Sequence, residues 1–282
     1  MIIGEEQEFL AKLNLVEYDE VDSTNDELRR ILESRGGVSD RVLCVTALKQ
    51  TKGRGRLGRT WESPPGGLYV SLALEVTDAV EKIAPLSLLV ALAIRNELAK
   101  PDSRTKGDGS CVLVLSQDNT RTHEPSPFVL QVKWPNDIVC EQGKLCGILI
   151  ELVQLQSKQQ FAIIGVGINV TRPEKGASNR AAYLSDLCAA TPNIRQTAKQ
   201  VLAGILTYAN RWKQASYDFA GFTKEYNSHL SLIDQEVTVS NSAGEAIAEG
   251  IVQGVDKSGQ LLLQDEKGII RKVSSGEVTL RR

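Results

Sequence analysis

Hydrophobic positions along this chain follow two periods, which predict two kinds of element. Apolar runs with strand length and β-branched character predict strands at residues 41–50, 66–76, 111–116, 128–134, 144–154 and 160–170. The last two runs lie close together in sequence and predict an antiparallel pair. Helical periodicity predicts helices at residues 85–100, 195–217 and 219–230, the first of them started by Pro85.

Near the N-terminus, residues 20–34 (EVDSTNDELRRILES) predict a strand that leads into a capped helix. Thr24 and Glu27 have the T-x-x-E spacing of a capping box, in which Thr24 would cap the helix.

The pattern changes after Ile233 to short β-rich runs separated by SAGE, DKSG and DEKG. Four or five short strands with tight turns over about fifty residues predict a small β-barrel. We therefore expect an α+β fold with a mixed or antiparallel sheet flanked by helices in residues 1–232, and a second domain in residues 233–282.

The amino-acid composition excludes several kinds of functional site but says little about the fold. The 33 basic and 35 acidic residues give a net charge of −2, so any anion site must be local rather than a property of the whole chain. Only His123 and His229 are present, which disfavours a zinc site or a histidine-dependent triad. No signal sequence or long apolar run is apparent, and five scattered cysteines suit reduced thiols, so we expect a cytoplasmic protein without a membrane partner.

Positive charge is nevertheless concentrated in residues 49–61, KQTKGRGRLGRTW. Three glycines let the backbone approach a ligand, and Arg54, Arg56 and Arg59 supply planar donors for a carboxylate or phosphate. The pattern is neither a P-loop nor a Rossmann fingerprint. From these residues alone, an anion site and an ordinary surface loop remain equal alternatives.

A second segment, KWPND at residues 133–137, predicts a strand that ends at Trp134 before Pro135. Asn136 and Asp137 would then be presented from a turn, either as ligands or as ordinary turn residues. Lys144 stands just before the next predicted strand, from which it would point into the same cleft or into solvent.

Taken together, these segments resemble a biotin protein ligase over nearly the whole chain. The resemblance includes DSTN at 22–25, the loop at 49–61, KWPNDI at 133–138, GKLCGILIE at 143–151, GVGINV at 165–170 and the terminal GEVTLRR. It implies a class II synthetase-like catalytic domain followed by an SH3-like barrel. It also implies that biotin and ATP form biotinyl-5′-adenylate with Mg²⁺, and that biotin is then transferred to a lysine of a carboxylase carrier domain of the acetyl-CoA carboxylase type.

The resemblance also implies roles for individual residues. The residues implied to bind biotin are Ser23, Thr24, Asn25, Gln50, Arg54, Gly55, Arg56 and Lys144. Those implied to bind the nucleotide are Arg56, Arg59, Asn136, Asn169 and Arg281. Arg56, Lys144 and Asp137 are the implied catalytic residues, with Asp137 also a metal ligand and a candidate base for the acceptor lysine. Tyr183 is one candidate for stacking against adenine, although the local register leaves this open.

Two departures from the better-known regulatory members of the family affect the expected function. The STN motif begins only 23 residues from the start, so we expect a ligase without a DNA-binding domain or repressor function. Residues 101–127 form a longer insertion than we expect, and the sequence does not indicate their role. A homodimer is one of the oligomeric states left open.

Two other functions remain as alternatives. A lipoate–protein ligase has a similar fold and chemistry, although GRGRLGR together with KWPND favours biotin. A noncatalytic RNA-binding module could use the loop and the barrel, but the low net charge and the 5% aromatic content disfavour it.

Overall fold

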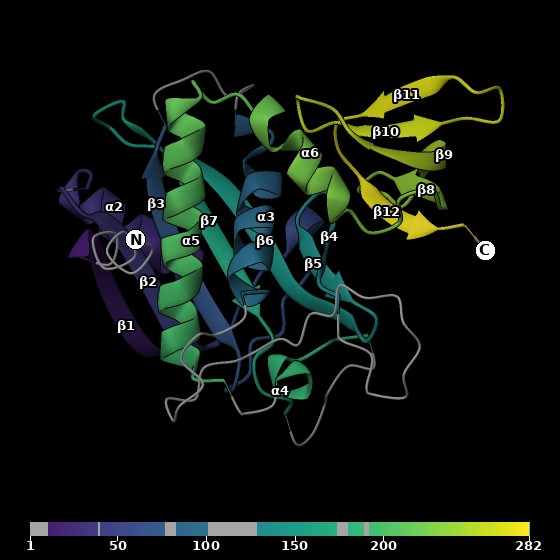
Figure 1. Ribbon diagram of the computed structural model, residues 1–282. Helices are drawn as coiled ribbons and strands as arrows, with labels where there is room; N and C mark the ends of the chain where they lie inside the picture. The colour runs from purple at the N-terminus through teal and green to yellow at the C-terminus, as the bar shows by residue number, and fades with distance from the viewer. Residues whose placement is uncertain are drawn as a thin grey trace.

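A seven-stranded mixed sheet occupies the centre of the molecule in the computed structural model, which describes residues 11–38, 40–76, 83–100, 129–173, 180–188 and 192–281 (Figure 1). Its strands are β1 (Leu13–Val21), β2 (Val42–Gln50), β3 (Leu68–Glu75), β4 (Gln131–Lys133), β5 (Asp137–Cys140), β6 (Gly143–Gln154) and β7 (Gln160–Ile168). The strand order is β1-β2-β3-β7-β6-β5-β4; β1 and β2 are parallel and every other neighbouring pair is antiparallel. The expected mixed sheet is confirmed, including the antiparallel pair formed by β6 and β7.

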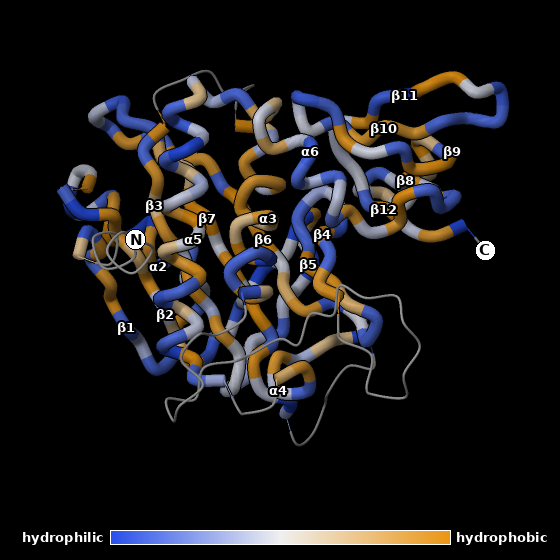
Figure 2. The backbone as a smooth tube through the Cα atoms, viewed as in Figure 1, coloured by the Kyte–Doolittle hydropathy of each residue, from blue (hydrophilic) through white to orange (hydrophobic). Residues whose placement is uncertain are grey.

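Helices cover both faces of this sheet because its strands are apolar on both sides. The helices are α2 (Thr24–Arg35), α3 (Leu86–Leu98), α4 (Leu184–Leu187), α5 (Ile194–Gln214) and α6 (Ala220–Ser228). Along β7, Ile164 and Val166 face the core under α3 and α5, whereas Phe161 and Ile163 face the core under α2. Figure 2 shows the apolar character of α3 and of the strands behind it.

Helix α2 is anchored by apolar burial and by a side-chain cap. Leu28 and Leu32 are fully buried, which contributes roughly 1.5–3 kcal/mol for each side chain. The N-cap is Ser23, whose hydroxyl accepts a hydrogen bond from the Asp26 amide at 3.5 Å. The prediction of Thr24 as the cap is therefore wrong by one residue, because the Thr24 hydroxyl contacts Gln50 and Ser71 instead.

The C-terminal residues form a second, five-stranded antiparallel sheet. Its strands are β8 (Glu236–Ser240), β9 (Ala246–Val255), β10 (Leu261–Gln264), β11 (Ile270–Val273) and β12 (Glu277–Leu280). The order β11-β10-β9-β8-β12 is linear, so among the described residues no ladder closes the sheet. The number of strands is confirmed, and the arrangement is consistent with an SH3-like domain. The prediction of a closed barrel is wrong for the described residues, because strand and turn patterns do not determine whether the two edge strands meet.

This second sheet packs closely against the first. The Trp134 indole donates a hydrogen bond to the Gly259 carbonyl at 2.9 Å, and the Asn227 amide exchanges two hydrogen bonds with the Val255 backbone. Val252 of β9 belongs to the same apolar cluster as residues of α3 and α5. The turn at residues 134–136 is therefore held by the C-terminal sheet.

Several local predictions need correction or fall outside the described residues. The strand Asp137–Cys140 was not predicted, and Lys144 lies within β6 rather than before it. The predicted strand at 111–116 and the insertion at 101–127 lie outside the described residues. Val129 and Leu130, which precede β4, are the first described residues after them.

The cysteine expectation holds for three described residues and fails for one. Cys44, Cys140 and Cys146 are free and buried, as expected for reduced thiols. Cys188 is disulfide-bonded, which the scattered spacing did not indicate, because spacing along a chain does not show which sulfur atoms meet in space. Cys111 lies outside the described residues.

Within the described part of the chain, none of the helices combines the length and the apolar character that crossing a membrane requires.

Candidate active site

A cavity that is partly open to solvent lies on the face of the main sheet that carries α2. Most of the residues predicted from sequence line this cavity, namely Ser23, Thr24, Asn25, Gln50, Arg54, Gly55, Arg56, Arg59, Asn136, Asp137 and Lys144. The structure thus brings together segments that are more than one hundred residues apart.

Glycines on the sheet create the space for this cavity. On one face of β7, Phe161 and Ile163 are followed by Gly165 and Gly167, so the surface changes from bulky side chains to bare backbone. A Cβ atom on Gly167 would lie 2.5 Å from the Trp61 indole nitrogen. Gly147 of β6 is the register partner of Gly167, and a Cβ there would lie 2.9 Å from the same ring. The glycine pair therefore forms a flat platform for Trp61.

The end of the cavity near α2 is lined mainly by uncharged polar groups, and the charge of Arg54 there is offset by Asp26 and Glu151. The Gln50 amide oxygen accepts a hydrogen bond from the Thr24 backbone N–H at 2.8 Å, and Gln50 Nε2 donates to the Ser63 hydroxyl at 2.9 Å. The buried Ser71 hydroxyl lies 2.6 Å from Asn25 Oδ1 and 2.8 Å from Thr24 Oγ1. These contacts fix the orientation of the Gln50 and Asn25 side-chain amides. Because an amide NH₂ group carries two hydrogens, each side chain keeps a second N–H that it can donate to a ligand.

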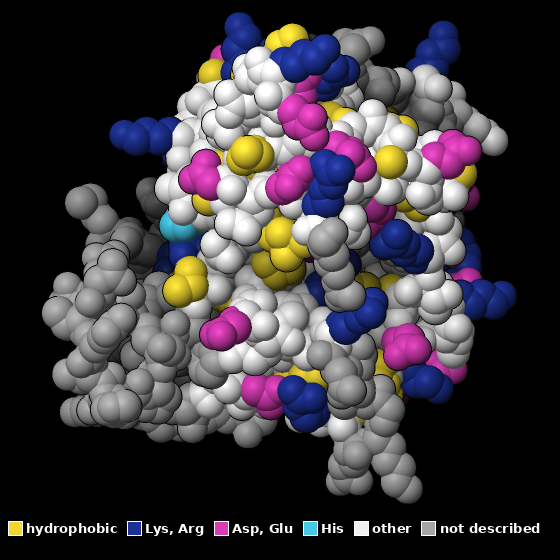
Figure 3. All heavy atoms as spheres, turned by 90° about the vertical axis from the view of Figure 1, so that its right-hand side faces the viewer, with side chains coloured by type: hydrophobic (Ala, Val, Ile, Leu, Met, Phe, Trp, Pro, Cys, Tyr) yellow, Lys and Arg dark blue, Asp and Glu magenta, His cyan; other side chains and the backbone are white. Residues whose placement is uncertain are grey.

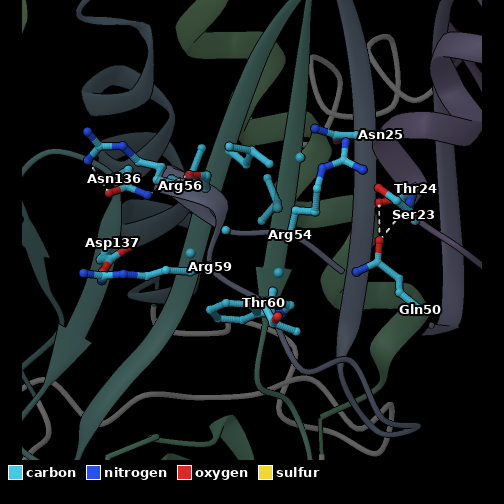
Figure 4. A pocket seen from close by; sticks show the side chains of 18 of the residues that line it. Ser23, Thr24, Asn25, Gln50, Arg54, Arg56, Arg59, Thr60, Asn136 and Asp137 are labelled. Carbon is cyan, nitrogen blue, oxygen red and sulfur yellow. Dashed lines mark hydrogen bonds between the residues drawn. The ribbon is translucent and has the colours of Figure 1, made fainter. Parts of the chain in front are cut away.

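The opposite end carries positive charge, as Figure 4 shows by placing Arg56, Arg59, Asn136 and Asp137 across the cavity from the Ser23 group. Arg56 donates a hydrogen bond to Asn136 Oδ1 at 3.1 Å. Asn136 is itself held by donating to the Ile148 carbonyl at 2.8 Å. Burial lowers the pKa of Arg56, although an arginine remains charged at neutral pH.

Lys144 reaches the cavity because β6 contains a bulge. The register with β5 shifts between Ile138 and Val139, so that Lys144 and Gly147 line the same cavity although they are an odd number of residues apart. Lys144 Nζ lies 2.8 Å from Asp137 Oδ1 and 5.2 Å from the centre of the Trp61 ring. Asp137 Oδ1 is buried, and Lys144 is the cation that pairs with it.

The loop at residues 53–61 covers the cavity and is closed by its own backbone. The Trp61 N–H donates to the Gly53 carbonyl at 2.9 Å, and the Gly55 N–H donates to the Arg59 carbonyl at 2.7 Å. Leu57 at its tip has φ 56°, an uncommon conformation for a bulky residue. We call residues 53–61 the arginine loop below.

The three loop arginines differ in their partners. Arg54 forms a bidentate pair with Asp26 and also contacts Glu151, and the hydrogen bonds from Arg54 lower the pKa of Asp26. Arg59 pairs with Glu277 of β12 at 3.0 Å. Arg56 has a neutral partner, so its charge is the least compensated of the three among the described residues.

A second cavity of about 980 Å³ adjoins the first, with Lys144 and Trp61 in the shared wall. Its lining includes Asn169, Tyr69 and Tyr183, so it is richer in aromatic rings than the first cavity. Asn169 donates to the Lys144 carbonyl at 3.1 Å and thereby ties the end of β7 to β6. The Tyr183 ring lies 4.5 Å below the Arg172 guanidinium, with Tyr183 almost fully buried.

Not every predicted residue lies at these cavities. Arg281 lines neither of them and instead pairs with Glu236 at 2.7 Å and with Glu249 at 3.5 Å. Sequence reasoning missed Trp61, Ser71, Glu151 and Glu277, which line the cavity or hold residues that do. Gly165 and Gly167, spaced two apart in a strand, were a signal that a ring or a side chain packs on that face.

Two carboxylate residues, Asp137 and Glu277, line the cavity, and Glu277 is paired with Arg59. The described residues contain no group of three His, Cys, Asp or Glu side chains suited to a metal. Mg²⁺, however, is commonly held by one or two carboxylates together with substrate phosphates. Asp137, which lines the cavity beside Lys144, is a carboxylate of the kind that this arrangement uses.

The fold and the cavities define a class of protein that binds one small molecule between an uncharged polar end and a cationic end, beside a second, aromatic cavity. Comparison with known proteins agrees with this description. Residues 21–169 match the biotin/lipoate A/B protein ligase family, and residues 232–281 match the biotin protein ligase C-terminal domain. The chain therefore belongs to the biotin/lipoate A/B protein ligase family and, by its second match, to the biotin protein ligases within it.

Individual relatives support this membership. The chain is 30% identical to the biotin–[acetyl-CoA-carboxylase] ligase of Mycobacterium tuberculosis, over 91% of this chain and 85% of the relative. It is also 30% identical to the bifunctional ligase/repressor BirA of Escherichia coli, over 93% of this chain and 72% of that protein. Among solved structures, the biotin protein ligase from Aquifex aeolicus in complex with biotin and ATP aligns with a TM-score of 0.68 at 29% identity, covering 95% of this chain and 99% of that one.

Proposed function

We propose that this enzyme activates biotin with ATP to biotinyl-5′-adenylate and then transfers the biotinyl group to a lysine of a carboxylase carrier domain. The observation that carries the proposal is the single cavity with uncharged amides at one end and Arg56 and Lys144 at the other. Biotin has the same polarity, with a neutral ureido head and an ionised carboxylate. The M. tuberculosis relative is named for this activity alone, which supports a ligase without repressor function.

The uncharged end would bind the ureido head. The second N–H of Gln50 and of Asn25 and the hydroxyl of Ser23 provide donors and acceptors for its carbonyl and N–H groups. The dithiolane ring of lipoate offers no comparable hydrogen-bonding groups. This end of the cavity therefore favours biotin, because leaving buried polar groups unpaired costs binding free energy.

The cationic end would perform the first step. A carboxylate oxygen of biotin attacks the α-phosphorus of ATP, so that an oxygen–phosphorus bond forms. The bond from the α-phosphorus to the oxygen that bridges to the β-phosphate breaks, and pyrophosphate leaves. The carboxylate is already ionised at neutral pH and needs no general base. Arg56 and Lys144 offset the repulsion between the two anions and stabilise the charge that develops on the phosphate oxygens.

Asp137 would hold Mg²⁺ together with the substrate phosphates, because its carboxylate lines the cationic end of the cavity, where the phosphates would lie. When bound, the ion would neutralise phosphate charge. Asn136, which is held by Ile148, would keep Arg56 directed at the phosphates.

The second cavity would bind the nucleotide. Its aromatic residues Trp61, Tyr69 and Tyr183 offer faces or edges for adenine, and Lys144 in the shared wall can contact the α-phosphate from either side. Asn169 would contribute mainly by fixing the Lys144 backbone. Arg59 lies at the mouth of the first cavity, whereas Arg281 would need to leave Glu236 to reach the nucleotide.

In the second step, the ε-amine of the acceptor lysine attacks the acyl carbon and an amide bond forms. The bond between the acyl carbon and the bridging oxygen breaks, and AMP leaves with that oxygen and the bonding electrons. The amine must first lose a proton. Asp137 is the carboxylate best placed to accept it, because its Oδ1 faces the cavity beside Lys144.

The wider assignments belong to the same proposal. Residues 1–232 would form the catalytic domain and residues 233–282 the C-terminal domain, in a cytoplasmic enzyme whose carrier is of the acetyl-CoA carboxylase type. On the face that carries the C-terminal sheet, basic and acidic side chains are interspersed, which does not favour a nucleic-acid track there (Figure 3).

The test is incorporation of labelled biotin into an apo carrier domain in the presence and absence of ATP. We expect ATP-dependent labelling of one lysine, and competition by unlabelled biotin but not by lipoate. Labelling by lipoate and not by biotin would replace the proposal with a lipoate ligase, whereas salt-sensitive RNA binding without any labelling would replace it with an RNA-binding module.

A further inference from the structure

Glu151 of β6 touches both the uncharged end of the first cavity and the arginine loop. Its Oε2 accepts a hydrogen bond from Asn25 Nδ2 at 2.7 Å, and both carboxylate oxygens lie 3.2 Å from Arg54 Nη2. Its side chain is 24% exposed. Glu151 is therefore one carboxylate shared by two elements that line the same cavity.

The contact with Asn25 fixes the direction of that amide. Asn25 Oδ1 faces the buried Ser71 hydroxyl at 2.6 Å, while Nδ2 faces Glu151. A flipped amide would set its NH₂ group against the hydroxyl and its oxygen against the carboxylate, which is repulsive. Glu151 thus determines which donor Asn25 presents to the cavity.

The contact with Arg54 joins the loop to the sheet. Arg54 also pairs with Asp26 at the start of α2, and its backbone bridges Thr60 on the returning strand of the loop. Arg54 consequently holds the loop against both α2 and β6. Its charge is offset by two carboxylates, which leaves Arg56 and Lys144 to receive the anionic part of a ligand.

We propose that Glu151 is a positioning residue for biotin binding, which fixes the Asn25 amide and holds the arginine loop over the cavity through Arg54. The inference rests on the proposed function, because biotin is the ligand that it concerns. Glu151 itself needs no contact with biotin.

The variant Glu151→Gln tests this with nearly the same side-chain shape. A glutamine cannot accept from both Asn25 and Arg54 without presenting its NH₂ group to a donor, so one charged hydrogen bond is lost. We expect the Kd of biotin, measured by calorimetry, to rise about 10- to 100-fold. Trypsin should cleave faster at Arg54 and Arg56. The KM for biotin should rise more than kcat falls, whereas a partly unfolded enzyme would lose kcat and keep its KM.

A double-mutant cycle identifies the route of the effect. In an Asn25→Ala background, Glu151→Gln should weaken biotin binding less than it does in the wild type, because part of its role has already been removed. Glu17→Gln is the matched control, since it removes a carboxylate from an exposed pair with Arg195, 3.3 Å away on the β1 side of the sheet. That variant should bind biotin like the wild type.

The outcomes separate the inference from the proposed function. If the wild type binds biotin and Glu151→Gln binds it equally well, the positioning role is wrong and the proposed function stands. Equal effects of Glu151→Gln in the wild-type and Asn25→Ala backgrounds would also overturn it. If the wild type does not bind biotin, the proposed function fails and the inference fails with it.

Discussion

At the scale of single residues, the three arginines of the arginine loop differ in whether a carboxylate offsets their charge. Arg54 and Arg59 each have a carboxylate partner, whereas Arg56 contacts the neutral Asn136 and is more than half buried. A charge held in a partly desolvated position by a neutral partner interacts strongly with an incoming anion. Arg56 is therefore the loop residue best suited to retain an acyl-adenylate.

Replacing Arg56 by glycine should release that intermediate. In Arg56→Gly, the adenylate should leave the cavity and acylate lysines on unrelated proteins, because the cation that holds its phosphate is gone. Mass spectrometry of a mixture of the enzyme, ATP, biotin and serum albumin would detect the labelled lysines. Lys52→Ala, which changes an exposed lysine beside the same loop, is the control and should leave albumin unlabelled. Serum albumin left as unlabelled by Arg56→Gly as by Lys52→Ala would contradict this role.

The turn before α2 has a measurable dependence on pH. Hydrogen bonds from Arg30 lower the pKa of Asp22 to about 2, and the same carboxylate accepts from the Ser23 N–H at 2.8 Å. A carboxyl whose pKa is lower in the folded state than the ordinary 3.8 stabilises the fold above pH 3.8, and this contribution is lost as the pH falls towards 2.

Asp22→Asn should therefore be less stable than the wild type at pH 7, and the two should converge as the pH falls to about 2. Because this pair is largely solvent-exposed, we expect a difference of about 1 kcal/mol or less at pH 7. Urea denaturation at both pH values measures the free energies of unfolding. A difference that does not change with pH would show that the ion pair with Arg30 is not its source.

Residue types could be predicted from the sequence better than residue pairings. Ser23, Thr24, Asn25 and Gln50 were assigned to one ligand end, and the structure brings them together. Glu151 was not assigned, because its partners lie 97 and 126 positions away in sequence. Contacts between residues so far apart in sequence depend on the order of the strands in the sheet, and the pattern of residues along the chain does not show that order.

At the scale of elements, the cavity depends on where the sheet lacks side chains. Gly147 and Gly167 are register partners on β6 and β7, and the Trp61 ring occupies the space above them. Neither Gly165 nor Gly167 has a positive φ. Glycine is therefore needed at these positions because it has no side chain, and not because of its backbone conformation. The strand pattern predicts these strands but not which ring covers them.

Gly167→Ala tests the platform directly. The added Cβ would meet Trp61 Nε1 at 2.5 Å, so the ring must move, which should lower the free energy of unfolding by about 1–3 kcal/mol. The affinity for ATP, measured by calorimetry, should fall as well. Gly221→Ala in α6 is the matched control: its Cβ would meet nothing within 4 Å, and it should stabilise the helix by about 0.5–1 kcal/mol. Equal behaviour of the two variants would contradict the role of the platform.

The long elements α5, β6 and β7 were predicted correctly, whereas the short strand β5 was not. The 21-residue helix α5 and the strands β6 and β7 have clear periodicity, whereas β5 has four residues and follows a turn directly. The bulge at β5 and β6 was also missed, although it directs Lys144 into the cavity. A bulge adds one residue to a strand without changing its composition, so the pattern gives no sign of it.

At the scale of the whole molecule, the two sheets act on one site. Trp134 is anchored to Gly259 of the C-terminal sheet, two residues before Asn136, and Glu277 of β12 pairs with Arg59 of the loop. Residues of both sheets share one apolar cluster. The sequence predicted a second unit with four or five strands, and the resemblance assigned its Arg281 to the nucleotide. The structure instead places Glu277 at the cavity and Arg281 against Glu236, because contacts between units are fixed by packing.

The central claim is that the cavity joins biotin to a carrier lysine at the expense of ATP. The most direct measurement compares the wild type with Lys144→Ala, using labelled biotin, ATP and an apo carrier domain, with transfer followed by the mass of the carrier. We expect the wild type to add one biotinyl group per carrier only when ATP is present. Lys144→Ala should lower the rate by about 100-fold or more, because it removes a preorganised cation from the reacting phosphate and carboxylate. A carrier that remains unmodified by the wild type with ATP, or a Lys144→Ala enzyme as fast as the wild type, would contradict the account.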